Sequence, residues 1–140
     1  AQIAANYCQG NIGKAIRFAS SSDFIEMKNQ VLKLLKNLDS MDIASIIDTI
    51  KEFSTHKNDI NDYLDLMLLW YRDVLMFKVT KDANLLLYSD EYSAISEQAT
   101  KRDYENIENI IAAIDKAKVR LKANVNFDVT IELMILAMKD

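Results

Sequence analysis

Proline is absent from all 140 residues of this chain, and glycine occurs only twice, at Gly10 and Gly13. All-β folds need many tight turns built with these residues, and dinucleotide- and phosphate-binding loops need clustered glycines. Both classes of protein are therefore nearly excluded. The sequence predicts an all-α fold, a compact bundle of about five to seven helices around a long central apolar helix.

Charge and cysteine content narrow the function classes further. The formal net charge of −4 argues against a strongly basic surface for nucleic acid. The single cysteine, Cys8, cannot form an internal disulfide, and together with the single histidine, His56, it cannot complete a structural zinc site. We interpret Cys8 as a small buried apolar residue and His56 as a solvated residue in a polar turn. We expect no cofactor, no metal and a reducing, cytoplasmic location.

Apolar residues recur every three or four positions over most of the chain, which is the period of amphipathic helices. Between 43 and 53, for example, one helix face is formed by Ile43, Ile46, Ile47, Ile50 and Phe53. A short basic helix is expected at 12–19, with a domain edge near 20–23. Asp39 or Ser40 is expected to cap the second helix after that edge, Asp103 the fifth and Asn126 the last one. The helices expected after the edge span residues 23–38, about 40–53, 59–79, 91–100, about 103–122 and 127–138.

The helix expected at 59–79 is apolar on nearly every side, which is typical of the centre of a bundle. The sequence Trp70-Tyr71-Arg72-Asp73 lies in its middle, and the adjacent charges need partners because burying an unpaired charge is very costly. Glu132 in the equally apolar last helix poses the same problem. We predict that Arg72 and Glu132 form an ion pair.

Two other charged patterns favour structural roles over binding sites. Asp59, Asp62 and Asp65 recur every third residue at the start of the central helix, where carboxylates complement the helix dipole, and this interpretation is favoured over metal binding. The alternating cations between Lys116 and Lys122 favour a solvated basic helix end over a nucleic-acid site. The longest apolar run, 66–71, is far shorter than a membrane span, so we expect no membrane partner.

Three motifs, in their order and spacing, carry a family resemblance. They are G-N-I-G-K-A-I at 10–16 with F-A-S after it, L-L-W-Y-R-D-V-L at 68–75, and N-V-N-F-D-V-T-I-E-L-M-I-L at 124–136. Together they resemble the delta-prime subunits of bacterial DNA polymerase III, which belong to the clamp loader, an AAA+ assembly that places the sliding clamp on primed DNA. The sequence starts with alanine in the middle of a helical pattern, so we expect a piece of a longer chain.

The resemblance implies two parts, with residues 1–21 as the end of an AAA+ lid domain and residues 22–140 as a C-terminal helical collar domain. Gly10, Gly13 and Lys14 form the sensor-2-like segment. Gly13 stands where active clamp-loader ATPases have arginine, which fits a subunit that does not hydrolyse ATP. The family motifs further imply a structural or interface role for a set of residues shared between the central and last helices: Trp70, Tyr71, Arg72, Asp73, Asn124, Asn126 and Glu132.

The resemblance also implies the partners. These are the delta and ATPase subunits, contacted through the collar, while DNA is reached only indirectly. The fragment by itself is expected to be a monomer or a weak dimer and not an enzyme, within a parent holoenzyme that is a DNA-directed DNA polymerase. We expect exposed apolar and aromatic side chains after Asp59 to gather on two faces.

Alternatives remain open at this point. The chain is either this collar domain, the C-terminal domain of another clamp-loader subunit, or an unrelated all-helical regulatory or ligand-sensing domain with a pocket between helices. Four aromatic residues off the main apolar stripes are interface candidates: Trp70, Tyr63, Tyr88 and Tyr92. For Trp70, a position in the core is slightly favoured.

Overall fold

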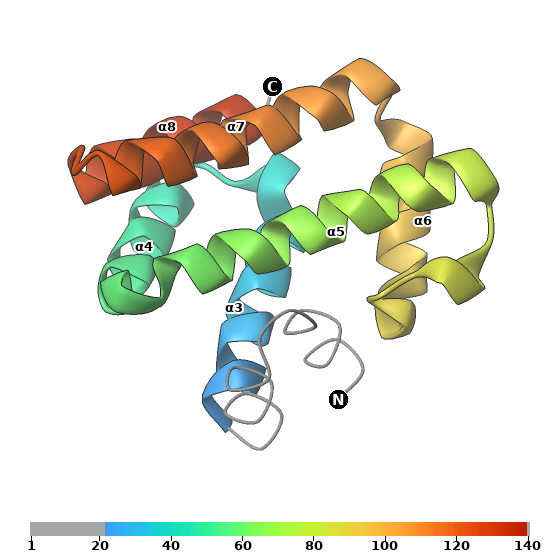
Figure 1. The fold of residues 1–140 in the computed structure, drawn as a ribbon, viewed down its shortest axis with the longest axis horizontal. Coiled ribbons are helices and arrows are strands. Elements are labelled where there is room, and N and C mark those ends of the chain that lie inside the picture. Colours follow the sequence, from blue (N-terminus) through green and yellow to red (C-terminus); the bar gives the residue numbers. More distant parts are fainter. Residues whose placement is uncertain (1–21, 140) are drawn as a thin grey trace.

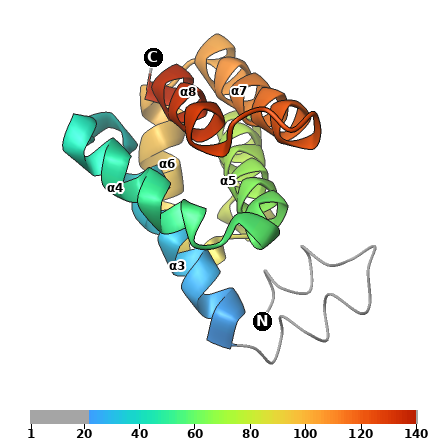
Figure 2. The same cartoon turned by 90° about the vertical axis from the view of Figure 1, so that its left-hand side faces the viewer.

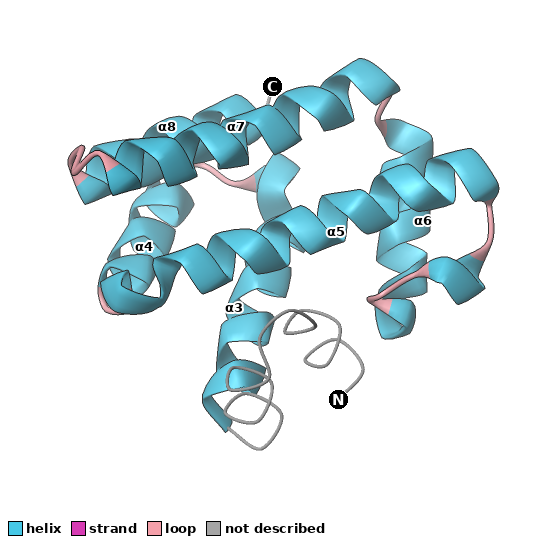
Figure 3. Ribbon diagram, viewed as in Figure 1, coloured by secondary structure: helices cyan, strands magenta, loops and turns pink. Residues whose placement is uncertain are grey.

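The three-dimensional structure is a computed structural model, and it describes residues 22–139. In this part of the chain six α-helices follow one another without a strand (Figures 1 and 3), which confirms the all-α prediction. The helices are α3 (Ser22–Asn37), α4 (Ile43–Ser54), α5 (Ile60–Thr80), α6 (Tyr92–Lys101), α7 (Tyr104–Lys122) and α8 (Phe127–Lys139). Cys8 and the sensor-2-like segment with Gly10, Gly13 and Lys14 lie outside the described residues.

Helix α5 runs through the middle of the bundle and contacts α3, α6 and α7 (Figure 1). Helix α8 packs on α7 on one side and on α4 on the other, so that it forms part of the outer surface (Figure 2). The central helix, which the sequence predicts at 59–79, is α5 at Ile60–Thr80, one residue later. None of the helices in the described part of the chain is both long and apolar enough to cross a lipid bilayer.

Burial explains why α5 is apolar on nearly every side. Leu64, Leu66, Met67 and Val74 have no exposed surface, because neighbouring helices cover α5 from several directions. Fully burying an aliphatic side chain of this size contributes about 1.5–3 kcal/mol. Packing around α5 is therefore a large contribution to the stability of the bundle.

Capping residues set the starts of three helices. Asp103 and Asn126 accept hydrogen bonds from the amides of Asn106 (2.7 Å) and Val129 (3.0 Å), as expected for the caps of α7 and α8. The predicted cap of α4 is wrong. Residues Leu38–Ser40 form a 3-10 turn that extends α3, and Asp42, in an extended backbone conformation, accepts from the Ser45 amide at 2.8 Å.

The connection between α5 and α6 has no regular element longer than a 3-10 turn. Lys81 ends α5 in the left-handed conformation, with φ 59°, and its amide donates to the Phe77 carbonyl. Two 3-10 turns follow, Ala83–Leu85 and Ser89–Glu91. This segment folds back along α5, which brings the buried Tyr88 against the centre of the bundle.

Candidate protein-interaction surfaces

The outer side of α4 and α8 carries an unusual number of exposed aliphatic side chains. We call it the α4–α8 surface, and it consists of Ile43, Ile47, Val129, Leu133 and Leu136, which are 76, 45, 47, 44 and 45% exposed. Residues three and four positions apart lie on one side of a helix, so the three residues of α8 form a single apolar ridge. Helix α8 itself lies beside α4 (Figure 2). Contiguous exposed apolar patches commonly mark interaction sites.

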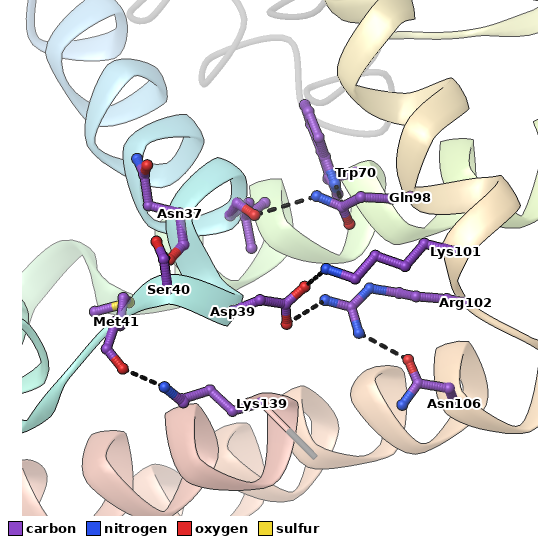
Figure 4. Close-up of polar contacts among 11 residues, drawn as sticks. Asn37, Asp39, Ser40, Met41, Trp70, Gln98, Lys101, Arg102, Asn106 and Lys139 are labelled. Atoms are coloured by element: carbon purple, nitrogen blue, oxygen red, sulfur yellow. Dashed lines mark hydrogen bonds and ion pairs between the residues drawn. The ribbon is translucent and has the colours of Figure 1, made fainter.

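A shallow hollow lies between the two helices at one end of this surface. It is lined by Met41, Asp42, Ile43, Ala44, Ile46, Leu136 and Lys139. The ammonium group of Lys139 donates to the Met41 carbonyl oxygen, which ties the end of α8 to the start of α4 (Figure 4). The hollow is therefore a fixed feature of the packing of α8 against α4.

Acidic side chains dominate the border of the α4–α8 surface. The exposed carboxylate of Asp42 comes from the cap of α4, and those of Asp128 and Glu132 come from α8. The hydrogen bonds from Ser45 lower the pKa of Asp42, and the nearby Lys139 charge adds to this effect, so Asp42 is ionised at neutral pH.

A second, smaller group of exposed apolar and aromatic side chains surrounds the carboxyl end of α5. Val79 and Leu85 are 62 and 49% exposed, and Tyr92 and Tyr104 are 44 and 49% exposed. Tyr92 makes an edge contact with Phe77, with ring centroids 5.4 Å apart, and the Lys78 ammonium lies 5.1 Å from the Tyr104 ring centre. Val119 and Val125 are also exposed, apart from both groups, near the α7–α8 turn.

Three of the four aromatic interface candidates belong to the core. Trp70 and Tyr88 have no exposed surface and Tyr63 is 2% exposed, which leaves only Tyr92 at the surface. The polar atoms of the buried rings are paired. The indole nitrogen of Trp70 donates to Gln98 at 3.4 Å, and the hydroxyl groups of Tyr63 and Tyr88 donate to the Gln30 side chain (2.7 Å) and the Leu66 carbonyl (2.8 Å). Burial raises the pKa of Tyr63 to about 12, with a smaller contribution from Glu26.

The predicted ion pair between Arg72 and Glu132 is wrong. Both side chains are exposed, and none of the ion pairs of the described residues joins them. The prediction assumed that both charges are buried, whereas α5 and α8 each turn these positions to the surface. Tyr71 is fully buried, and its hydroxyl group makes no hydrogen bond within the described residues.

Asp73 is one of two charged residues of α5 that the fold buries, at 1% exposure, and the other is Asp62 at 6%. Its carboxylate accepts hydrogen bonds from the amides of Leu87 (3.0 Å) and Tyr88 (2.7 Å). Burial raises the pKa of Asp73, although these two bonds oppose the shift. Asp73 therefore anchors the α5–α6 connection, a structural role that its position beside Arg72 did not reveal.

A second polar cluster joins the end of α3 to α6 and α7 (Figure 4). The Asp39 carboxylate pairs with Lys101 and with Arg102, whose Nη2 atom is 3.2 Å away, and Arg102 Nη1 donates to the Asn106 side chain at 2.8 Å. Beside them, Gln98 donates to the Leu35 carbonyl at 3.1 Å. Burial acts to raise the pKa of Asp39, but the Lys101 hydrogen bond and the neighbouring positive charges outweigh it and lower the pKa.

The remaining candidates take up separate positions. Asp65 pairs with Lys118, so the acidic row of α5 meets the basic end of α7, and Asn124 forms the turn before Asn126 with a φ of 61°. Asparagine tolerates this left-handed conformation better than most residues. The His56 ring lies 5.8 Å from that of Tyr63. Within residues 22–139, no three His, Cys, Asp or Glu side chains are placed to hold a metal ion.

Over 143 aligned residues the chain is 29% identical to the DNA polymerase III subunit delta′ of Bacillus subtilis (strain 168). The similarity extends over the whole length of the chain, and it covers only part of the subunit. The family resemblance drawn from the three motifs is thereby confirmed. No family model and no solved structure matches the chain.

The match covers 100% of this chain and 43% of the delta-prime relative, so the chain spans less than half of that protein's length. The alignment is consistent with the C-terminal part of the delta-prime subunit. The sequence pattern does not reveal the α4–α8 surface, because it places Ile43 and Ile47 on one helix face together with Ile46 and Phe53. The available signal was in residues 127–139, where only Asp128, Glu132 and Lys139 are charged.

Proposed function

We propose that the chain is the C-terminal part of a clamp-loader delta-prime subunit and that it acts as a collar module, a protein–protein assembly domain. In this proposal residues 22–140 form the collar domain and residues 1–21 the end of the AAA+ lid. The observation that carries the proposal is the similarity to a delta-prime subunit over the whole chain. The exposed α4–α8 surface supports it, because such apolar surface is typical of protein interfaces.

The proposed partners are the delta subunit and the ATPase subunits of the loader. Subunits in an ordered ring meet through heterologous contacts, so each neighbour faces a different part of the domain. The two groups of exposed apolar side chains, on α4–α8 and around the end of α5, come from different helices and provide two such contacts. DNA is reached only indirectly, the module is not itself an enzyme, and it works in the bacterial cytoplasm.

The proposal is tested by mixing the chain with the delta and ATPase subunits of the same organism. Light scattering coupled to size-exclusion chromatography is expected to show a larger species at tens of micromolar. Interfaces of the usual size bury roughly 800 Å² per partner, which is sufficient for stable association at this concentration. An unrelated helical protein of similar size serves as the control. Separate elution of all components would contradict the proposed function.

A further inference from the structure

We propose that the α4–α8 surface seats one amphipathic α-helix of a neighbouring clamp-loader subunit, with an aliphatic stripe that is flanked by lysine and arginine side chains. This inference rests on the proposed function and extends it, because it names the binding surface and the chemistry of the partner. The surface residues are Ile43, Ile47, Val129, Leu133 and Leu136.

The shape of the surface favours a helix as the partner. Ile43 and Ile47 are four residues apart on α4, and Val129, Leu133 and Leu136 are four and three residues apart on α8. Side chains at these spacings form ridges, and two packed helices fit the ridges of one into the grooves of the other. The hollow between α4 and α8, at the end of the surface beside Ile43 and Leu136, provides part of a groove for a third helix.

The side chains of the α4–α8 surface favour a partner helix whose contacting residues are aliphatic. The five residues of the surface are branched aliphatic and carry no hydrogen-bonding group, and the hollow adds Met41 and Ala44. A polar group buried against them would lose its hydrogen bonds to water without replacement. The exposed tyrosines Tyr92 and Tyr104, which do carry a polar group, lie instead around the end of α5.

The charges at the border of the α4–α8 surface favour a partner helix with positively charged residues beside its apolar stripe. Three carboxylates lie beside the apolar residues, those of Asp42, Asp128 and Glu132, against the two ammonium groups of Lys51 and Lys139. Lys139 is already bound to the Met41 carbonyl. A partner with lysines and arginines beside its apolar stripe matches this border, and such complementarity raises the association rate and selects among partners. A second copy of this chain would instead present the same acidic border, and like charges across an interface are unfavourable.

The first test replaces single residues of the apolar ridge. In the full 140-residue chain, Leu133→Asp and Leu136→Asp are expected to weaken binding to the neighbouring subunit by about 30-fold or more, since each places a charge at the centre of the interface. Val119→Asp is the matched control, because Val119 is 68% exposed on α7 and lies outside the surface. Calorimetric titration measures the affinity, and circular dichroism confirms that each variant is folded.

The second test reverses a border charge. Glu132→Lys is expected to weaken binding roughly tenfold at low salt, with a smaller effect at high salt, because ions screen exposed charges. Glu105→Lys, an exposed acidic residue at the start of α7, is the control and is expected to change little. Tighter binding of Glu132→Lys would overturn the proposed basic flanks.

The outcomes separate this inference from the proposed function. If the unaltered chain binds no loader subunit, both are overturned. If the unaltered chain binds and the Leu133→Asp and Leu136→Asp variants bind equally well, the surface assignment is overturned and the collar function stands. If these variants abolish only self-association of the chain, the occupant is a second copy, and the proposed heterologous partner is overturned.

Discussion

The centre of the bundle and the α4–α8 surface use similar apolar side chains in opposite settings. Around α5, Trp70 and Leu66 are completely buried, and the polar groups of the neighbouring Asp73 and Tyr88 have hydrogen-bond partners. On α4 and α8, Ile43 and Leu133 are 76 and 44% exposed. The comparison shows that apolar periodicity marks both a core and an interface. Substitutions at the centre should therefore change folding stability, and substitutions at the surface should change association.

The largest effect is expected from Trp70→Ala. Trp70 has no exposed surface, contacts Tyr88 with ring centroids 5.3 Å apart and donates to Gln98, so its removal leaves a large cavity. The free energy of unfolding should fall by about 3–5 kcal/mol, measured by urea denaturation. Tyr104→Ala, which removes a half-exposed aromatic ring, is the matched control and should cost about 1 kcal/mol or less. Equal losses from the two variants would show that the centre does not contribute more to stability than the surface.

A smaller loss is expected from Asp73→Asn. The carboxylate accepts two amide hydrogen bonds, whereas asparagine retains one acceptor and turns an NH₂ group toward the second amide. Leaving a buried donor unpaired costs about 1–3 kcal/mol in the free energy of unfolding. Asp90→Asn changes an exposed aspartate in the same connection and should have almost no effect. Amide hydrogen exchange at Leu87 and Tyr88 should become faster in Asp73→Asn and should not change in Asp90→Asn.

The centre of the bundle and the α4–α8 surface also differ in how well the sequence predicts them. The three-and-four spacing of apolar residues and the caps Asp103 and Asn126 give the helices to within about two residues at most boundaries. Trp70 was slightly favoured as a core residue, and the structure confirms this. The sequence carries this information because helix period and capping act over a few residues.

Contacts between distant segments are not encoded in such local patterns. The partners of Asp73 lie 14 and 15 residues away along the chain, and Asp39 pairs with Arg102 across 63 residues. Which side of an apolar helix remains exposed also depends on where neighbouring helices pack. For this reason the apolar pattern around Ile43 does not reveal that this residue stays exposed, and the predicted Arg72–Glu132 pair does not form.

The ion pairs of Asp39 with Lys101 and Arg102 predict how the stability of the bundle depends on pH. Its positive neighbours lower the pKa of Asp39 from the usual 3.8, so the folded state holds the proton less tightly than the unfolded state. The stabilisation is present above the unfolded pKa and is lost as the pH falls through the folded value. Since Asp39 is 38% exposed, we expect about 1 kcal/mol or less. The stability difference between the unaltered chain and Asp39→Asn should shrink as the pH falls through the unfolded pKa of 3.8 and below it, measured by urea titrations. A difference that grows on acidification would contradict the assigned pairing.

The smallest effect on folding is expected at the α4–α8 surface. Ile43 is 76% exposed, so Ile43→Ala removes little packing, and the better helix propensity of alanine offsets the loss. The free energy of unfolding should change by no more than about 0.5 kcal/mol. Ile46→Ala is a matched control three residues along the same helix, where the side chain is 5% exposed, and it should cost about 2–5 kcal/mol. If Ile43→Ala destabilises the chain as much as Ile46→Ala, Ile43 packs within the domain and the distinction between core and interface fails at α4. If only Ile46→Ala destabilises it, the exposed isoleucine contributes nothing to folding, and its apolar character is explained by association.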